Sequence, residues 1–137
     1  MSWNGAKSAC RQIVGGDLIS VHNFDEKKVL NSMAQNNFVS RQDQSVHWPG
    51  FDQGVWIGLR DQMKNGNGWA WSDDTPLTYT DWLTERPDPV GEAEHCAHAT
   101  SYMPKTHGSV AFGWNDMNCA AKMKSVCKAP RIALYPA

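Results

Sequence analysis

Apolar residues in the first part of the chain recur at the spacing of a helix. Trp3, Ala6, Cys10 and Ile13 are three or four residues apart, so they lie on one face of a helix. A glycine pair at residues 15–16 follows, and glycine commonly occupies the position just after a helix. The pattern predicts a first helix that buries this face and ends at the glycines.

A second helix is predicted after residue 23. Asn23, with Glu26 three residues later, is typical of an N-cap, because such side chains satisfy backbone N–H groups of the first turn. The apolar positions expected on its buried face are Val29, Leu30, Met33 and Ala34. The stretch "DLISV" before it predicts a short strand, and the helix is expected to end near residues 36–37.

The remainder of the chain favours short strands. Residues 38–53 are polar, contain a Pro-Gly break and keep no period, which predicts an irregular surface connection. Strands are predicted at "VWIGLR", "GWAWSDD" and "TYTDW", and the last third holds "HCAHA", "VAFGWND" and "SVCKAP". Helices first and strands afterwards predict an α+β fold.

Length and charge limit the classes of protein to consider. The 137 residues suit one domain with a single core. With 13 basic and 14 acidic residues interleaved, no surface for nucleic acid or anionic lipid is indicated. No apolar run approaches the ~18 residues of a membrane span, and the first ten residues lack a signal-peptide pattern. The chain also lacks GxSxG, HExxH and P-loop motifs, so we expect no enzyme.

Tryptophan and cysteine are the informative residue types. Seven tryptophans suit a small domain that gains stability from large buried aromatics. We expect core positions for Trp56, Trp69, Trp71, Trp82 and Trp114. The four cysteines lie in no CxxC pair and at no zinc-finger spacing, so they predict two disulfides, the alternative being four buried thiols. Disulfides imply an extracellular compartment.

The chain resembles a C-type lectin-like domain over nearly its whole length. The residues that carry the resemblance are "WNGAKSAC", "GGDLISVH", "WIGL" at 56–59, "WAWSDDTPLTYTDW", "EHC", "WND" at 114–116, Cys119 and "SVC". The resemblance implies two helices flanking short antiparallel sheets, a long loop, and disulfides from Cys10 to Cys127 and from Cys96 to Cys119. It also implies a recognition domain that acts outside the cell.

Sugar-binding members of this family hold one Ca²⁺ between the long loop and the WND strand, and two sugar hydroxyls complete its coordination. Four expected ligands are present in this sequence: Asp88, Glu94, Asn115 and Asp116. All are oxygen donors, which Ca²⁺ prefers. The resemblance therefore implies calcium-dependent binding of carbohydrate at these residues, with a cis peptide bond at Pro87.

Arg86 departs from the family pattern. The tripeptide Arg86-Pro87-Asp88 stands where members carry Glu-Pro-Asn for mannose-type or Gln-Pro-Asp for galactose-type ligands, so Asp88 slightly favours galactose. Arginine has no acceptor atom and its charge repels calcium, so it must point away from the ion or the site holds none. Glu85 and Glu92 offer it carboxylate partners on the same loop, and both arrangements are compatible with the sequence. Arg86 also supports the alternative function, a calcium-independent, protein-recognising module of the same fold without sugar binding.

The interval 97–113 supports that alternative, because it is longer than a compact member needs. We expect a surface loop there, whose exposed residues could contact a sugar or a protein: His98, Tyr102, Met103 and His107. The group His95, Cys96 and His98 is a poor zinc site, because Cys96 is committed to a disulfide and successive strand residues face opposite sides.

The termini also depart from the family. A first strand that usually pairs with the C-terminal strand is missing, and residues 128–137 form a C-terminal extension of the single domain 1–137. Ile132, Leu134 and Tyr135 have the composition of a strand. We expect residues 131–135 either to fold back or to pair with a second copy, giving a homo-oligomer joined through the termini. Excision of a fragment from a longer protein explains the missing strand equally well.

Overall fold

The computed structural model describes residues 1–34, 54–63, 66–83, 86–87, 95–102 and 111–130. Within these ranges the order of elements is α1, β1, α2 and then β2 to β7. The predicted α+β class is confirmed, with both helices preceding the main strands. No helix among the described residues has the length and hydrophobicity required to cross a bilayer.

Side-chain caps start both helices. In α1 (Trp3–Arg11), the Ser2 hydroxyl accepts a hydrogen bond from the Gly5 N–H at 3.2 Å. In α2 (Phe24–Ala34), the Asn23 side-chain oxygen accepts one from the Glu26 N–H at 2.9 Å. These caps satisfy donors that have no partner within the helix, and the predicted Asn23 cap is confirmed.

The buried faces of both helices are narrower than the apolar pattern predicts. Trp3, Ala6 and Cys10 of α1 are buried, as expected. Ile13 follows the end of α1 and is 47% exposed, so its prediction was wrong. In α2, Leu30 and Ala34 are buried, whereas Val29 and Met33 are 57% and 62% exposed. Only one line of residues spaced by four contacts the sheet, which is why the other two apolar positions face outward.

The strands form a two-stranded antiparallel sheet and a larger, mainly antiparallel sheet. The short β1 (Asp17–Leu18) pairs with β7 (Cys127–Lys128). The larger sheet has the order β3-β2-β4-β5, with bounds β2 (Val55–Asp61), β3 (Trp69–Trp71), β4 (Cys96–Tyr102) and β5 (Ala111–Met117). In addition, β6 (Lys124–Ser125) pairs in parallel with β2. The prediction of a strand at "TYTDW" was wrong, since this segment contributes only an isolated bridge at Trp82.

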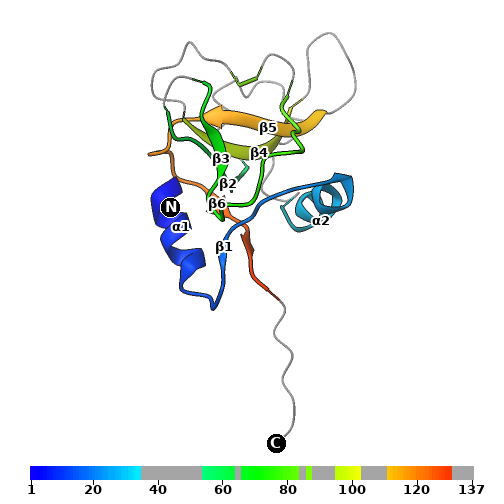
Figure 1. Ribbon diagram of the computed structural model, residues 1–137. Coiled ribbons are helices and arrows are strands. Elements are labelled where there is room, and N and C mark those ends of the chain that lie inside the picture. Colours follow the sequence, from blue (N-terminus) through cyan, green and yellow to red (C-terminus); the bar gives the residue numbers. More distant parts are fainter. Residues whose placement is uncertain (35–53, 64–65, 84–85, 88–94, 103–110, 131–137) are drawn as a thin grey trace, which may run out of the picture.

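Alternating residues of β2 contribute to two core clusters. Val55, Ile57 and Leu59 pack in the cluster that includes Leu30 of α2. Trp56 packs in the cluster that includes Trp3 of α1. The two helices accordingly lie on opposite sides of the central strands (Figure 1). Strand alternation therefore gives each helix its own face to cover.

The tryptophans form the centre of the larger cluster. Trp71 and Trp114 are 1% exposed, and Trp69 and Trp82 are partly buried against the same cluster, whereas the fully buried Trp56 lies in the cluster of Trp3. The rings of Trp71 and Trp82 lie edge-on to Trp114, at 5.4 and 5.8 Å between centroids. The predicted structural role of these residues is confirmed.

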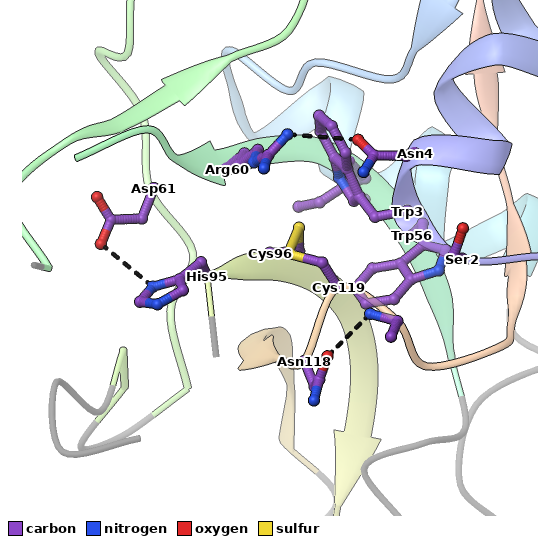
Figure 2. The surroundings of a disulfide bond; sticks show 12 residues. Ser2, Trp3, Asn4, Trp56, Arg60, Asp61, His95, Cys96, Asn118 and Cys119 are labelled. Atoms are coloured by element: carbon purple, nitrogen blue, oxygen red, sulfur yellow. Dashed lines mark hydrogen bonds and ion pairs between the residues drawn. A yellow bond between two sulfur atoms is a disulfide. The ribbon is translucent and has the colours of Figure 1, made fainter. Parts of the chain in front are cut away.

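Both disulfides are present as the family resemblance implied. Cys10–Cys127 joins α1 to β7 across a sequence separation of 117. Cys96–Cys119 joins the start of β4 to the segment after β5 across a separation of 23 (Figure 2). The chain start is also tied to this region, because Met1 and Met123 exchange backbone hydrogen bonds of 3.0 Å in both directions. The predicted strand at residues 131–135 lies outside the described residues.

Candidate functional site

The upstream end of the predicted long loop is held against β5. The Trp114 N–H donates to the Asp81 carbonyl at 2.8 Å, and the Leu83 N–H donates to the Trp114 carbonyl at 2.9 Å. The Arg86 N–H in turn donates to the Leu83 carbonyl at 2.9 Å. The chain therefore enters the loop beside the residue that immediately precedes Asn115.

Gly113 makes this close approach sterically feasible. A Cβ atom at this position would lie 2.6 Å from the Asp81 carbonyl oxygen and 3.1 Å from the Leu83 side chain. A backbone oxygen cannot yield without breaking the pairing, so any larger residue would push the 81–83 segment away. The sequence analysis missed this role, although the glycine directly before "WND" was a visible signal.

The downstream end of the loop is anchored near Asn115 and Asp116 as well, on the side of Met117. The His95 carbonyl accepts a hydrogen bond from the Asp61 N–H at 2.8 Å, and Cys96 pairs with Met117 in the next register position. Figure 2 shows His95 directed toward the Asp61 carboxylate close to the Cys96 disulfide. Asn115 and Asp116 thus lie between the two points at which the loop is anchored.

Asp61 is the buried group that fixes this second anchor. Its side chain is 1% exposed, and its carboxylate accepts hydrogen bonds from the backbone N–H groups of Met63, Gly66 and Gly68. The His95 ring lies 3.8 Å from the same carboxylate. The Asp61 carboxylate, which accepts these backbone N–H groups after β2, thus also contacts His95, the residue directly before β4.

Asn115 is held by a buried histidine on the neighbouring strand. Asn115 is 3% exposed and pairs in register with His98, and its amide nitrogen lies 3.1 Å from His98 Nε2. Burial lowers the pKa of His98 to about 3, so the ring is neutral at physiological pH. A neutral Nε2 can accept from the amide N–H, which leaves the amide oxygen of Asn115 turned away from His98.

The predicted metal ligands divide into two groups. Asn115 and Asp116 are consecutive residues of β5 and are both buried. Asp88 and Glu94 lie outside the described residues. Among described residues no group of three or more metal-ligating His, Cys, Asp or Glu side chains is found.

Arg86 and Pro87 fall within the described part of the chain. The peptide bond between them is cis, as the family resemblance implied. Both residues are half-buried. The Arg86 side chain is thus neither fully exposed nor part of the core.

The expectation of a surface loop at 97–113 was wrong for most of its length. Residues 96–102 form β4 and residues 111–117 form β5, which leaves residues 103–110, including Met103 and His107, outside the described residues. His98 is completely buried instead of exposed. Its position two residues after Cys96 was the available signal, because both side chains then face the same side of the strand.

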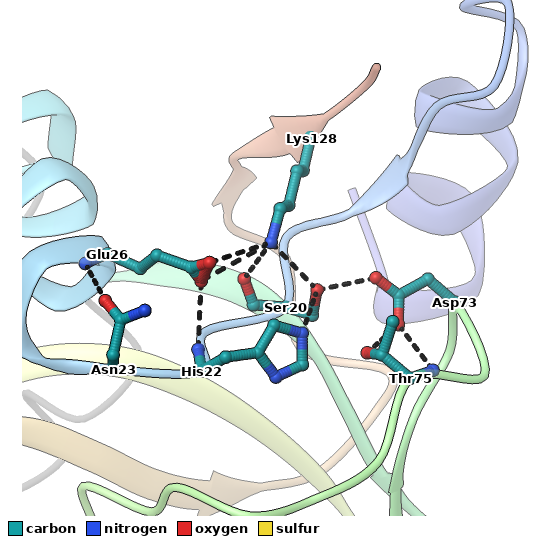
Figure 3. A network of polar contacts seen from close by, with 7 residues as sticks. All are labelled: Ser20, His22, Asn23, Glu26, Asp73, Thr75 and Lys128. Atoms are coloured by element: carbon teal, nitrogen blue, oxygen red, sulfur yellow. Dashed lines mark hydrogen bonds and ion pairs between the residues drawn. The ribbon is translucent and has the colours of Figure 1, made fainter.

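A second polar cluster combines serine, histidine and aspartate without forming a catalytic triad (Figure 3). The Ser20 hydroxyl donates to the Asp73 carboxylate at 2.5 Å and lies 3.1 Å from His22 Nε2. A triad requires the carboxylate on the far nitrogen of the histidine, whereas Asp73 here contacts the serine directly. Ser20 is also 1% exposed and therefore closed to a substrate.

The network has a structural role. Lys128 of β7 donates to the Ser20 carbonyl at 3.2 Å and to the Glu26 carboxylate at 3.4 Å. Glu26 also accepts from the His22 N–H at 2.9 Å. These bonds join α2, the segment after β1, and β7.

These features define a two-disulfide α+β domain whose long loop is anchored beside a buried Asn-Asp pair. A profile of the Lectin C-type domain family matches residues 1–129. The chain therefore belongs to the C-type lectin domain family. Domains of this family are binding modules and not enzymes.

Two relatives illustrate the match. C-type mannose receptor 2 of Mus musculus is 32% identical over 128 residues, which cover 93% of this chain and 7% of the receptor. C-type lectin lectoxin-Lio1 of Erythrolamprus poecilogyrus is also 32% identical, with coverage of 93% of this chain and 67% of the lectin. The chain thus spans a small part of the receptor's length and about two thirds of the lectoxin's.

Solved structures of similar fold include a carbohydrate-recognition domain and a calcium-independent protein. The carbohydrate-recognition domain of cow CD23, crystallised in the presence of a GlcNAc2Man3 oligosaccharide, is 25% identical with a TM-score of 0.64 and covers 96% of this chain and 83% of its own. A calcium-independent type II antifreeze protein is 26% identical with a TM-score of 0.64, covering 94% and 79%. The family includes carbohydrate-binding homologues, and calcium is not required by every neighbour.

Proposed function

We propose that this domain binds carbohydrate through a Ca²⁺ ion held by Asp88, Glu94, Asn115 and Asp116. The observation that carries the proposal is the position of Asn115 and Asp116 between the two anchors of the 84–94 segment. That segment contains Asp88 and Glu94 in the sequence. Both ends of the ligand-bearing loop are therefore tied to the strand that bears the other two ligands.

The donor chemistry supports calcium. Amide and carboxylate oxygens match the hard-ligand preference of this ion. Because the His98 ring binds the amide nitrogen of Asn115, the amide oxygen is the atom available to a cation. Asn115 and Asp116 project from opposite faces of β5, so an ion that contacts both lies along the outer edge of this edge strand. When bound, the ion supplies open coordination positions for two neighbouring hydroxyls of a sugar.

Arg86 determines how the site accommodates a positive ion. A guanidinium repels Ca²⁺, so in the bound state Arg86 turns outward and is available to a ligand beyond the ion. We propose galactose-type ligands, on the basis of Asp88 after Pro87, with Arg86 as an additional sugar contact. A glycan competition assay with galactose and mannose tests this preference.

Thermal unfolding with and without calcium tests the metal site. A dissociation constant near the millimolar range of extracellular calcium modules gives about 1.4 kcal/mol of stabilisation at tenfold excess. For a domain of this size we expect the melting temperature to rise by roughly 3–6 °C in 10 mM CaCl₂ relative to chelator. Asn115→Ala should remove the rise, whereas the control Asp25→Asn, an exposed acid on α2, should retain it.

A second function is favoured by Arg86. In this alternative the domain recognises a protein without calcium, since one oxygen donor of the family site is replaced by a cation. The variant Arg86→Gln distinguishes the two. A calcium response in both proteins supports the lectin, whereas a response that appears only in Arg86→Gln supports the calcium-independent module.

We also propose an extracellular location. Both disulfides join distant parts of the domain, and such bonds persist in oxidising compartments. Secretion of the domain from cultured cells, followed by mass measurement before and after reduction, tests this. The expected result is a gain of four hydrogens on reduction, two for each bridge.

A further inference from the structure

A polar hollow lies between α1, β2 and β3, away from the loop site. Its volume is about 380 Å³, and its lining includes Lys7, Arg11, Arg60, Gln62, Ser72 and Asp74. The strand residues of this hollow lie on β2 and β3, whereas Asn115 lies on β5 in the sheet order β3-β2-β4-β5. At a strand spacing of about 4.8 Å, β2 and β3 are roughly 10 and 14 Å from β5. A ligand in the hollow would therefore not contact the proposed calcium site.

Two of the cations are held on one indole ring. Lys7 Nζ lies 5.6 Å from the centre of the Trp3 ring, and Arg60 Cζ lies 5.3 Å from it. Trp3 is 1% exposed, and its Nε1 donates to the Ile57 carbonyl at 2.8 Å, which fixes the ring. Figure 2 shows Arg60 beside Trp3 and Asn4. Cation–π contacts of this kind limit the freedom of both side chains before any ligand arrives.

The positive charge of the hollow is not balanced by its own lining. Arg11 forms an ion pair with Asp17 at 3.2 Å. Lys7 and Arg60 form no ion pair with any residue in the described ranges, and Arg60 donates to the neutral Asn4 side chain at 3.3 Å. Asp74 is the sole acid among the lining residues. Because Asp17 already pairs with Arg11, Lys7 and Arg60 face Asp74 with an excess of one positive charge.

We infer that this hollow binds a sulfate or phosphate ester group of an anionic saccharide, where the saccharide part of the ligand rests on the proposed carbohydrate-binding function. Lys and Arg donors bind such oxyanions through charge-assisted hydrogen bonds. The volume is within the range of small-molecule sites. The lining exposes no large apolar side chain that would favour a peptide with apolar residues, because Trp3 is buried beneath the cations and Ala70 is the other apolar residue in the lining. The domain would then have an anion-binding site independent of calcium.

Calorimetric titration in chelator tests this inference without involving calcium. The probes are one glycosaminoglycan tetrasaccharide in three forms, sulfated, phosphorylated and unsubstituted. We expect an esterified form to bind and the unsubstituted form not to bind, and the tighter of the two esters identifies the anion. Binding should weaken as salt rises, because exposed charges are screened.

Variants locate the binding to the hollow. Lys7→Gln with Arg60→Gln should weaken binding at least tenfold, since about 1.4 kcal/mol corresponds to a factor of ten. The matched control, Lys122→Gln with Lys124→Gln, removes the same charge from exposed positions and should change affinity less than twofold. Lys7→Arg with Arg60→Lys preserves the charge and should retain binding, which separates ligand contact from misfolding.

Four results would overturn the inference. The first is failure of both esters to bind, and the second is equal binding of the unsubstituted saccharide. The third is an equal loss of affinity in the control variant, because that result would mean general attraction to a basic surface. The fourth is binding of poly-glutamate as tight as that of the ester through Lys7 and Arg60, which would make the partner an acidic peptide.

Discussion

The buried His98 ring predicts a loss of stability in mild acid. In the folded domain the ring is fully buried against Trp56 and Asn115, and burial lowers its pKa to about 3. In the unfolded chain the same histidine takes up a proton near pH 6.5. Lowering the pH from 7.5 to 5 therefore favours the unfolded state, because only that state gains the proton.

Proton linkage gives the sign and the size of this loss of stability. Between pH 3 and 6.5 the unfolded state binds more protons, so stability rises with pH across this window and is complete above it. At pH 5 the difference from the unfolded pKa is about 1.5 units, which is about 2 kcal/mol. For 137 residues this lowers the melting temperature by roughly 5–10 °C.

Urea unfolding at pH 7.5 and pH 5, both in chelator, measures this loss. His98→Gln keeps an acceptor for the Asn115 amide and cannot titrate, so its free energy of unfolding should fall about 2 kcal/mol less than that of the wild type. All other titrating groups are shared by the two proteins and cancel in the comparison. An identical loss in His98→Gln would refute the argument that buried neutral His98 controls acid stability.

Three further predictions concern the surroundings of the site. Burial raises the pKa of Asp81 despite its 2.9 Å bond to Lys27. The double variant Lys27→Met with Asp81→Leu should therefore have an unchanged or higher free energy of unfolding in urea, whereas Lys27→Met alone should lose about 2–3 kcal/mol. Equal losses in the two variants would contradict this. Gly113→Ala should destabilise by about 1–3 kcal/mol and reduce the calcium-induced shift in melting temperature, and an unchanged shift would mean that the 81–83 pairing does not hold the loop. Replacing Cys96 and Cys119 by serine should cost about 3 kcal/mol in guanidinium unfolding, as expected for the 23-residue separation, and a cost near zero would indicate residual order in the unfolded chain.

Local signals in the sequence predicted much of the fold. The Asn23 cap and the helix face of Trp3, Ala6 and Cys10 depend on contacts within one or two helical turns. The spacing of these residues in the sequence is therefore enough to place them in the structure. Val29 and Met33 could not be placed in this way, because how much of a helix face is buried depends on the shape of the sheet beneath it. The "TYTDW" segment has the composition of a strand. It forms only an isolated bridge because its backbone pairs with β5 at Trp114 alone.

The candidate site was predictable as a set of residue types and less so as an arrangement. Asn115 and Asp116 were identified by family resemblance, whereas the support from His98 depends on the register between β4 and β5. Register is a property of two strands far apart in sequence, so no pattern within "HCAHA" reveals it. The same limit explains why the Lys7 and Arg60 pair on Trp3 was missed.

The Cys10–Cys127 bond has a mechanical consequence. A pulling force applied at the two ends of the chain passes from residue 10 to residue 127 through one covalent link with 5.4 Å between the Cα atoms. The 117 intervening steps along the chain, which would extend by roughly 400 Å if released, carry no load while the bond is intact. Tension on the oxidised domain therefore leaves the strand that bears Asn115 and Asp116 unloaded, although it reaches Trp3 and Lys7, which precede Cys10. A reducing agent would convert the segment between the two cysteines into an extensible tether.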